Sequence, residues 1–325
     1  MTIATKPVGT TDLRVTHLSL GGSSFGNMGQ VVDAAQVAAV IEHAWAAGIR
    51  YFDTAPHYGR GLSEQRIGKI LRQKSRDDYV LSSKVGRVLF AGPPMEEADG
   101  FLQPLPNAVR YDYSGDGILE SFEGSCDRLG TSRIDIVFAH DIGAYTHGAE
   151  QNLHHMDDFL GSGVKALRDL KQAGRIGAFG LGVNEVQVCI DVMKQVPLDV
   201  ILLAGRLTLL DREAEADLLG LCAQQQTSLV LGGILNSGIL ATGPVPSASF
   251  DYAPAPEHIL QRVDLLQKQA ESVGMTLVQA ALQFAARHPA ACSVLLGTGK
   301  LRSLKRNLEI IDAPLSPEAL AFVTS

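Results

Sequence analysis

Eight short apolar runs alternate with amphipathic segments along almost the whole chain, and this alternation restricts the fold more than any other feature. The runs are rich in branched and aromatic residues, which is typical of buried strands. They comprise residues 17–22, 49–53, 79–84, 134–140, 176–182, 199–204, 228–233 and 292–297. Helical periodicity follows them, for example at Ala34–Ala46, Ile118–Leu129, Val164–Ala173, Ala214–Gln225 and Leu277–Arg287. Eight strands that are each followed by a helical pattern predict an α/β fold, a parallel (β/α)8 TIM barrel, better than a doubly wound sheet.

The rest of the chain agrees with one barrel domain over residues 1–325, because no linker, repeat or low-complexity tract divides it. Residues 6–18 alternate like a β-hairpin, and we expect this hairpin to plug the N-terminal end of the barrel. Three connections, at about residues 86–115, 142–163 and 234–256, are too long for ordinary βα loops. All three follow strands, which places them on the C-terminal face, where barrel enzymes build their active sites.

The net charge of −7 argues against nucleic acid or an anionic membrane surface as a partner. The four cysteines are scattered at positions 126, 189, 222 and 292 and form no C-x-x-C pair, so neither a disulfide framework nor a zinc knuckle is expected. Residues 1–15 lack an apolar signal core, and no run of 18 apolar residues occurs. These features predict a cytoplasmic protein.

Two further segments carry weaker signals. The stretch "HHMDD" at 154–158 holds metal-ligand residue types, but it lies in a predicted insertion without H-x-x-x-H spacing, so no metal site is predicted. The glycine-rich stretch "GGSSFGNMG" at 21–29 follows the first strand but lacks the G-x-G-x-x-G spacing. It is better interpreted as a tight first βα loop.

Polar side chains stand at the ends of three consecutive predicted strands. Asp53 ends the second strand, Lys84 the third and His140 the fourth, and Tyr58 lies in the loop after the second. Because consecutive barrel strands are neighbours, these four side chains can converge at the C-terminal rim. Taken singly, each has a plain structural interpretation as an ion pair, a rim tyrosine or a buried histidine. Together, in barrel order, they predict a site.

Elementary chemistry assigns these residues compatible roles. A lysine at the end of a buried strand needs an anionic partner, and Asp53 is one strand away. A tyrosine beside a charged lysine has its phenolate favoured, so we expect the pKa of Tyr58 to fall from its usual value of about 10. Tyr58 can then act as a general acid or base. His140 can donate or accept a hydrogen bond beside a reacting oxygen.

The segments "FDTAPHYG", "SSKVG" and "DIVFAHD" closely resemble the Asp, Tyr, Lys and His motifs of the aldo-keto reductases. The segment "GLGVNEV" (180–186) is similar to that family's fifth-strand motif, and "LLGTGKLRSLKRNLE" (295–309) to its phosphate and adenine segment. The resemblance implies a nicotinamide-dependent oxidoreductase acting on a small sugar or aldehyde. Tyr58 would transfer the proton, and Lys84 and Asp53 would tune the acidity of Tyr58. His140 would orient the substrate.

Longer segments are similar to one branch of the family, which contains L-fucose (D-threo-aldose) 1-dehydrogenases and pyridoxal 4-dehydrogenase. They are "YDYSGDGILESFEGSCDRLG", "LLAGRLTLLD", "GGILNSGIL" and "LQFAARHPA". The similarity implies NAD-dependent oxidation of a cyclic hemiacetal at C1 to the lactone. Oxidation of pyridoxal to 4-pyridoxolactone and general NADP-dependent reduction of aldehydes or ketones are the alternatives. A metal-dependent barrel hydrolase and a non-catalytic nucleotide-binding subunit fit the residues less well.

The same resemblance implies a set of cofactor contacts: Gly21, Asp53, Asn184, Gly232, Asn236, Ser237, Gly297, Thr298, Ser303 and Asn307. Several positions depart from the family pattern. Val183 stands where many members have Ser, Ala204 where many have Gln, and Gly232 where a nicotinamide-stacking Tyr is common. Backbone groups and Asn236 or Ser237 are therefore expected to take a larger part in holding the nicotinamide.

Two charged features bear on the cofactor. Arg206 could serve a diphosphate or the substrate, or form an ion pair with Asp211, and the sequence leaves these open. Aligning on Asn307 places Ser303 and Gly297 where NADP-using relatives carry Arg and Lys, which predicts NAD. The nearby basic residues that could replace those charges are Lys300, Arg302, Lys305 and Arg306.

Overall fold

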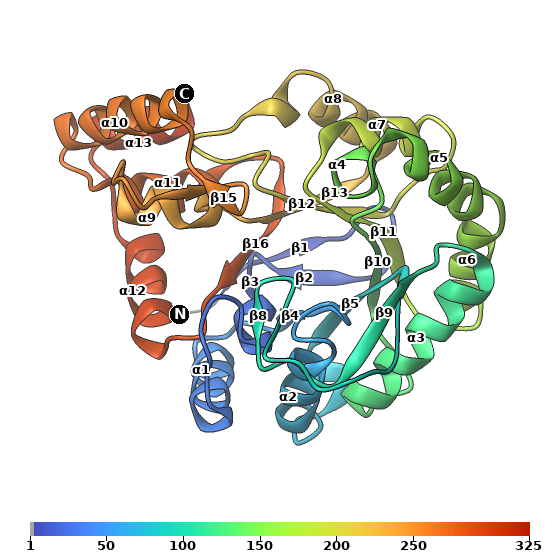
Figure 1. The fold of residues 1–325 in the computed structure, drawn as a ribbon. Helices are drawn as coiled ribbons and strands as arrows, with labels where there is room; N and C mark the ends of the chain where they lie inside the picture. Colours follow the sequence, from blue (N-terminus) through green and yellow to red (C-terminus); the bar gives the residue numbers. More distant parts are fainter. Residues whose placement is uncertain (1–2) are drawn as a thin grey trace.

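The computed structural model describes residues 3–325 and shows a closed barrel of eight parallel strands surrounded by helices (Figure 1). The barrel strands are β3 (Leu18–Gly21), β4 (Tyr51–Asp53), β5 (Val80–Val85), β10 (Ile136–His140), β11 (Ala178–Val183), β12 (Val200–Ala204), β13 (Ser228–Gly232) and β16 (Ala291–Gly297). They neighbour one another in chain order, and β16 closes the ring against β3. The predicted (β/α)8 barrel is confirmed, and each predicted apolar run overlaps one barrel strand, to within one residue where the strand extends beyond the run.

Amphipathic helices form the outer layer. They are α1 (Ala34–Ala46), α2 (Leu62–Leu71), α3 (Gly115–Leu129), α6 (Val164–Gln172), α7 (Val186–Met193), α8 (Leu218–Gln225), α10 (Glu257–Ser272), α11 (Leu277–Arg287), α12 (Leu301–Asp312) and α13 (Pro317–Thr324). Two predicted starts were wrong. Helix α3 begins earlier because the Ser114 side chain accepts the Gly117 N–H as an N-cap. Helix α8 begins later because a 3₁₀ turn (Glu213–Glu215) precedes it.

The predicted N-terminal hairpin is confirmed and closes one end of the barrel. Strands β1 (Thr5–Pro7) and β2 (Arg14–Thr16) pair antiparallel, and Val8 and Val15 are fully buried in a core cluster with residues that begin the barrel strands. Gly9 has φ +54°, and a Cβ there would lie 2.6 Å from the Asp199 carbonyl oxygen. The turn therefore fits against the barrel only with glycine at this position.

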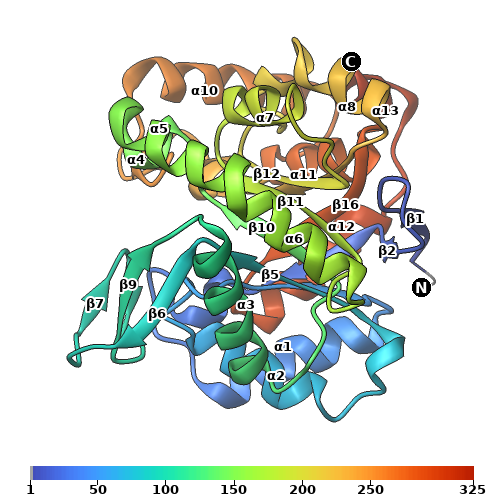
Figure 2. The same ribbon diagram turned by 90° about the vertical axis from the view of Figure 1, so that its right-hand side faces the viewer.

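The three long connections build the opposite end. After β5 come β6 (Arg87–Ala91) and β9 (Asn107–Tyr111), paired antiparallel, with β7 (Glu97–Ala98) and β8 (Phe101–Leu102) between them. After β10 come α4 (Ala144–His147), α5 (Ala149–Asp158) and a π-helical turn (Phe159–Gly163). After β13 come a 3₁₀ turn (Asn236–Gly238), α9 (Ile239–Thr242), β14 (Ser249–Phe250) and β15 (Ala253–Pro254). Figure 2 shows β6, β7 and β9 at one end of the molecule and β1 and β2 at the other.

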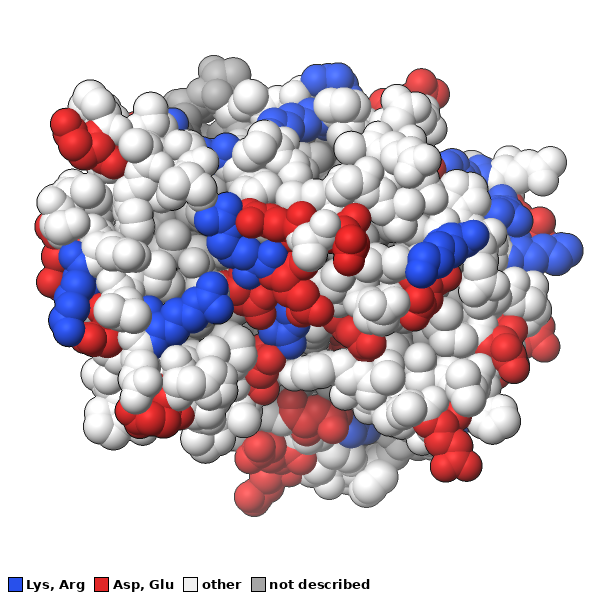
Figure 3. All heavy atoms as spheres, turned by 90° about the horizontal axis from the view of Figure 1, so that it is seen from above, with Lys and Arg blue, Asp and Glu red and all other residues white. Residues whose placement is uncertain are grey.

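The side of the barrel that lies uppermost in Figure 1 carries acidic and basic side chains next to one another (Figure 3). No single sign of charge dominates this face. None of the helices within residues 3–325 has the length and apolar character needed to cross a bilayer.

Candidate active site

The four predicted catalytic side chains meet at the C-terminal end of the barrel, around the ammonium group of Lys84. Lys84 Nζ donates hydrogen bonds to Asp53 Oδ2 at 2.8 Å, to the Thr54 carbonyl at 2.9 Å and to the Tyr58 hydroxyl at 3.1 Å. The rings of Tyr58 and His140 lie 5.9 Å apart at nearly a right angle. An ammonium group has three N–H donors, so Lys84 is fully hydrogen-bonded although its side chain is buried.

Two glycines bring the Tyr58 loop into place. Gly59 has φ +64°, and a Cβ on it would lie 2.5 Å from the Gly26 carbonyl oxygen. A Cβ on Gly26 would lie 2.4 Å from the Tyr58 carbonyl carbon. The glycine-rich stretch 21–29 is the predicted tight first loop, with a 3₁₀ turn (Ser23–Gly26), and it packs directly against the backbone of Tyr58. Because only glycine allows this close backbone contact at both positions, it fixes the position of the Tyr58 phenol relative to the barrel.

The predicted fall in the pKa of Tyr58 was wrong in its net direction. Burial raises the pKa of Tyr58, and this outweighs the neighbouring Lys84, which lowers it as expected. For Lys84, burial opposes the charged form, but Asp53 and Tyr58 outweigh it and raise its pKa. Lys84 therefore remains charged at neutral pH, while Tyr58 is a neutral phenol whose proton can pass to an oxygen bound beside it only when that oxygen becomes more basic than the phenolate during the reaction.

His140 is held neutral. Burial, followed by the positive charges of Arg87 and Lys84, lowers its pKa well below the usual value. Its Nδ1 atom is buried without a hydrogen-bond partner within the described part of the chain. A neutral imidazole can donate one hydrogen bond but carries no extra proton. His140 is therefore suited to orienting an oxygen and not to protonating it.

A second charged pair, which the sequence did not predict, lies beside His140. Arg87 Nη2 donates to Asp141 Oδ2, and the same oxygen lies 3.4 Å from His140 Nε2. Arg87 is 5% exposed. The sequence did contain a signal, since Arg87 follows Lys84 by three residues in "SSKVGR" and Asp141 directly follows His140.

The predicted cofactor contacts lie along one arc of the rim. Gly21 pairs with Gly297 and with Asp53 in the barrel register, while Asn184 directly follows β11 and Gly232 ends β13. Thr298 accepts a hydrogen bond from the Lys300 N–H at 3.1 Å, just before α12. Ser303 and Asn307 lie on α12 itself. The Asn307 side chain is nearly buried, and its Oδ1 atom has no hydrogen-bond partner within residues 3–325.

The side chains of Asn236 and Ser237 are engaged within the protein. Asn236 donates to the Gly205 carbonyl at 3.0 Å and accepts from the Thr208 hydroxyl at 2.6 Å. Ser237 accepts a hydrogen bond from the Tyr252 N–H at 3.0 Å. The Asn236 amide thus helps to hold the loop that follows β13.

The ion pair between Arg206 and Asp211, one of the alternatives that the sequence left open, is present. Arg206 also pairs with Asp251, which the sequence did not predict. Its guanidinium binds Asp251 through two nitrogens at 3.0 and 2.7 Å and Asp211 at 3.2 Å. Its Nε donates to the Asn184 carbonyl at 2.9 Å. Arg206 thereby ties together the loops that follow β11, β12 and β13, and these contacts use most of its donors.

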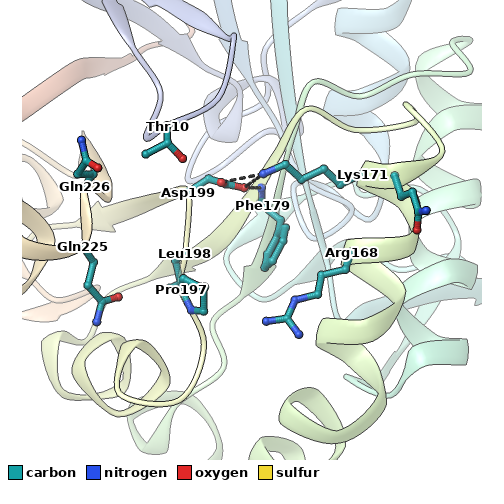
Figure 4. Close-up of a pocket in the computed structure, with 10 residues that line it drawn as sticks. Thr10, Arg168, Lys171, Phe179, Pro197, Leu198, Asp199, Gln225 and Gln226 are labelled. Atoms are coloured by element: carbon teal, nitrogen blue, oxygen red, sulfur yellow. Dashed lines mark hydrogen bonds and ion pairs between the residues drawn. The ribbon is translucent and has the colours of Figure 1, made fainter.

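A hollow of about 480 Å³ lies at the opposite end of the barrel (Figure 4). Its lining includes Thr10 of the N-terminal hairpin and an ion pair between Lys171 Nζ and Asp199 Oδ2 at 2.7 Å. This hollow contains none of the predicted catalytic residues. Within residues 3–325, no group of three or more His, Cys, Asp and Glu residues is arranged to hold a metal ion.

Known proteins resemble this chain over nearly its full length. The model of the aldo/keto reductase family matches residues 17–325. Pyridoxal 4-dehydrogenase from Microbacterium luteolum is 39% identical over 323 residues, covering 96% of this chain and 94% of that protein. D-threo-aldose 1-dehydrogenase from a Pseudomonas species is 33% identical over 303 residues, covering 91% and 89%. Among solved structures, the holo form of aldo-keto reductase AKR11C1 from Bacillus halodurans matches with a TM-score of 0.76 at 25% identity, covering 99% and 95%.

The buried Lys84–Asp53 pair generates a stability prediction. Lys84→Met should lower the free energy of unfolding by about 3–5 kcal/mol, because it leaves the Asp53 carboxylate buried without its cation. The double variant Asp53→Asn/Lys84→Met should recover part of this loss. Lys171→Met is the control, since its pair with Asp199 is more exposed and should contribute about 1 kcal/mol or less. Urea unfolding of the four proteins measures this, and a Lys84→Met variant as stable as wild type would contradict it.

Proposed function

This chain belongs to the aldo/keto reductase family, and we propose that it oxidises a cyclic hemiacetal, such as an aldose ring, at C1 to the lactone with NAD. Enzymes of this family use nicotinamide cofactors and act on small molecules. The observation that carries the proposal is the hydrogen bond from the charged, buried Lys84 to the Tyr58 hydroxyl, beside a neutral His140. The relatives named for D-threo-aldose and for pyridoxal support a ring substrate.

In the oxidative direction Tyr58, as phenolate, takes the proton of the anomeric hydroxyl while the C1–H bond breaks and its electron pair leaves as hydride. A bound nicotinamide supplies the hydride acceptor. The Lys84 ammonium stabilises the phenolate at 3.1 Å. His140 donates a hydrogen bond to the reacting oxygen and fixes its position between the two rings. The products are a lactone, the reduced cofactor and the proton on Tyr58.

Residues on the rim fit a dinucleotide. The buried Asn307 Oδ1 atom has no hydrogen-bond partner among the residues that the structure describes, and it can accept a hydrogen bond from the adenine amino group. Gly297 is exposed, and the first atom that a Cβ there would meet is 4.0 Å away, which leaves room for a phosphate before the N-terminus of α12. We assign Asn184 to the nicotinamide carboxamide, and Gly21, Gly232, Thr298 and the backbone at Asn236 and Ser237 to the remaining contacts.

A substrate panel tests the proposed reaction. Absorbance of the reduced nicotinamide should rise when wild-type protein is mixed with NAD and L-fucose or another D-threo-configured aldose. Pyridoxal is the second candidate, because a relative of 39% identity is named for its oxidation. Reduction of simple aldehydes or ketones with NADPH is the third. No change with any of these substrates and either cofactor would reject the proposed function.

We expect Tyr58→Phe to slow the hydride step by about 10²-fold or more, because the variant cannot relay the proton. Cofactor affinity, measured from the fluorescence of the reduced nicotinamide, should barely change. Because burial raises the pKa of Tyr58, oxidation by the wild type should speed up as the pH rises through that pKa, and reduction should slow down. Tyr79→Phe, at a buried tyrosine packed against Trp45, is the control. A Tyr58→Phe variant with most of its kcat would assign proton transfer to His140 or water.

Cofactor choice depends on α12. NADP preference needs a positive group on the ribose 2′-phosphate, ideally the planar fork of an arginine. Ser303 stands at the expected position of that arginine on α12. Ser303→Arg should therefore raise kcat/KM for NADP and have little effect with NAD. A wild-type protein that already favours NADP tenfold would contradict this, and would identify the exposed Lys300 or Arg302 as the clamp.

A further inference from the structure

Asp141 occupies an unusual position directly beside the reacting centre. It follows His140 at the end of β10 and has φ +50°, a left-handed conformation that costs energy for a residue with a side chain. The Asp141 N–H donates to the Gly182 carbonyl at 2.9 Å, which holds the strand end in place. The conformation is therefore stabilised by specific contacts.

One of these contacts is the ion pair between Asp141 and Arg87. Arg87 comes from β6, and its guanidinium lies 5.2 Å from the centre of the Tyr111 ring, which supports it from β9. Within residues 3–325 Asp141 is the only acid that pairs with Arg87. Burial raises the pKa of Asp141, and the charges of Arg87 and Lys84 oppose this by favouring the carboxylate. Because arginine does not lose its proton, the Arg87 guanidinium, which is 5% exposed, keeps this opposing charge at every working pH.

The two Asp141 oxygens are used unequally. Oδ2 receives the Arg87 hydrogen bond and lies 3.4 Å from His140 Nε2. Oδ1 receives no hydrogen bond within the described residues, and it is not among the buried polar atoms that lack a partner. The side chain is 15% exposed. Asp141 thus presents one charged acceptor oxygen, held rigidly and reachable from the site.

That oxygen is near the reacting groups. The Asp141 carboxylate is close enough to Tyr58 for its charge to contribute to the raised pKa of the phenol, after burial and other charges. In the reaction proposed above His140 binds the reacting oxygen, and the Asp141 carboxylate is next to the His140 ring. Hydroxyl oxygens on adjacent ring carbons are separated by about the distance of a hydrogen-bonded O···O pair, about 2.8 Å. The other oxygen of the same carboxylate, Oδ2, lies 3.4 Å from His140 Nε2, which places the Asp141 carboxylate within this range of the group that binds the reacting oxygen.

We propose that Asp141 is a specificity-determining residue that accepts a hydrogen bond from the hydroxyl on the carbon next to the reacting one, and that Arg87 positions it. The proposal rests on the function proposed above and names the substrate class more closely, as an α-hydroxy hemiacetal. A carboxylate accepts hydrogen bonds and donates none, so it selects a hydroxyl at this point and rejects a substrate that lacks one.

The test uses an aldose and its 2-deoxy counterpart, which differ only in that hydroxyl. Wild-type protein should favour the aldose in kcat/KM by about 10- to 100-fold, the range expected for one hydrogen bond to a charged group. Asp141→Asn should reduce this preference to about threefold or less, mainly by raising KM for the aldose. Asp199→Asn, which alters an ion-paired aspartate at the far end of the barrel, is the control and should keep the full preference.

Arg87→Lys provides a second variant if Asp141→Asn does not fold. Lysine keeps the charge but not the guanidinium fork, so the preference should fall to an intermediate value. Equal losses of kcat/KM for both rings in Asp141→Asn would show that Asp141 only orients His140, and would overturn the proposal. Equal efficiency of the wild type on both rings would also overturn it, while leaving the proposed function intact. A wild type that oxidises neither ring, nor any other substrate of the panel, would reject both.

Discussion

The buried ion pair between Lys84 and Asp53 is the interaction on which the rest of the site depends. Removing two charges from water is costly, and the cost is offset only when geometry and hydrogen bonding are nearly complete. Lys84 reaches this state with three acceptors, from the end of β4, the residue after it and the Tyr58 hydroxyl. The Tyr58 phenol is therefore held by one of the three hydrogen bonds that offset the cost of burying the Lys84 charge.

The sequence predicted the parts of this arrangement that barrel geometry determines. Asp53, Lys84 and His140 lie at or next to the ends of consecutive strands, and a parallel barrel brings such positions close together in space. The eight strands and the N-terminal hairpin followed from periodicity alone, because the core side chains lie within short continuous runs. Helix α3 begins at Gly115 because Ser114 caps it, a local signal that hydrophobic periodicity does not contain.

Two features of the site could not be predicted in this way. Whether burial or Lys84 controls the pKa of Tyr58 depends on how many atoms surround the phenol, which is a property of the packed structure. The pairs Arg87–Asp141 and Arg206–Asp251 join residues 54 and 45 positions apart through long connections. The path of such loops depends on contacts that no short sequence pattern encodes.

The two cations of the site, Lys84 and Arg87, contact different groups. Lys84 contacts the Tyr58 hydroxyl, while Arg87 contacts the carboxylate beside His140. Both lower the pKa of His140, after burial, so the imidazole stays neutral. A neutral His140 can donate a hydrogen bond to the reacting oxygen but cannot release an extra proton to it. In the proposed reaction Tyr58 therefore carries the proton at the reacting oxygen, and its protonation state sets which direction can proceed: phenolate for oxidation and phenol for reduction.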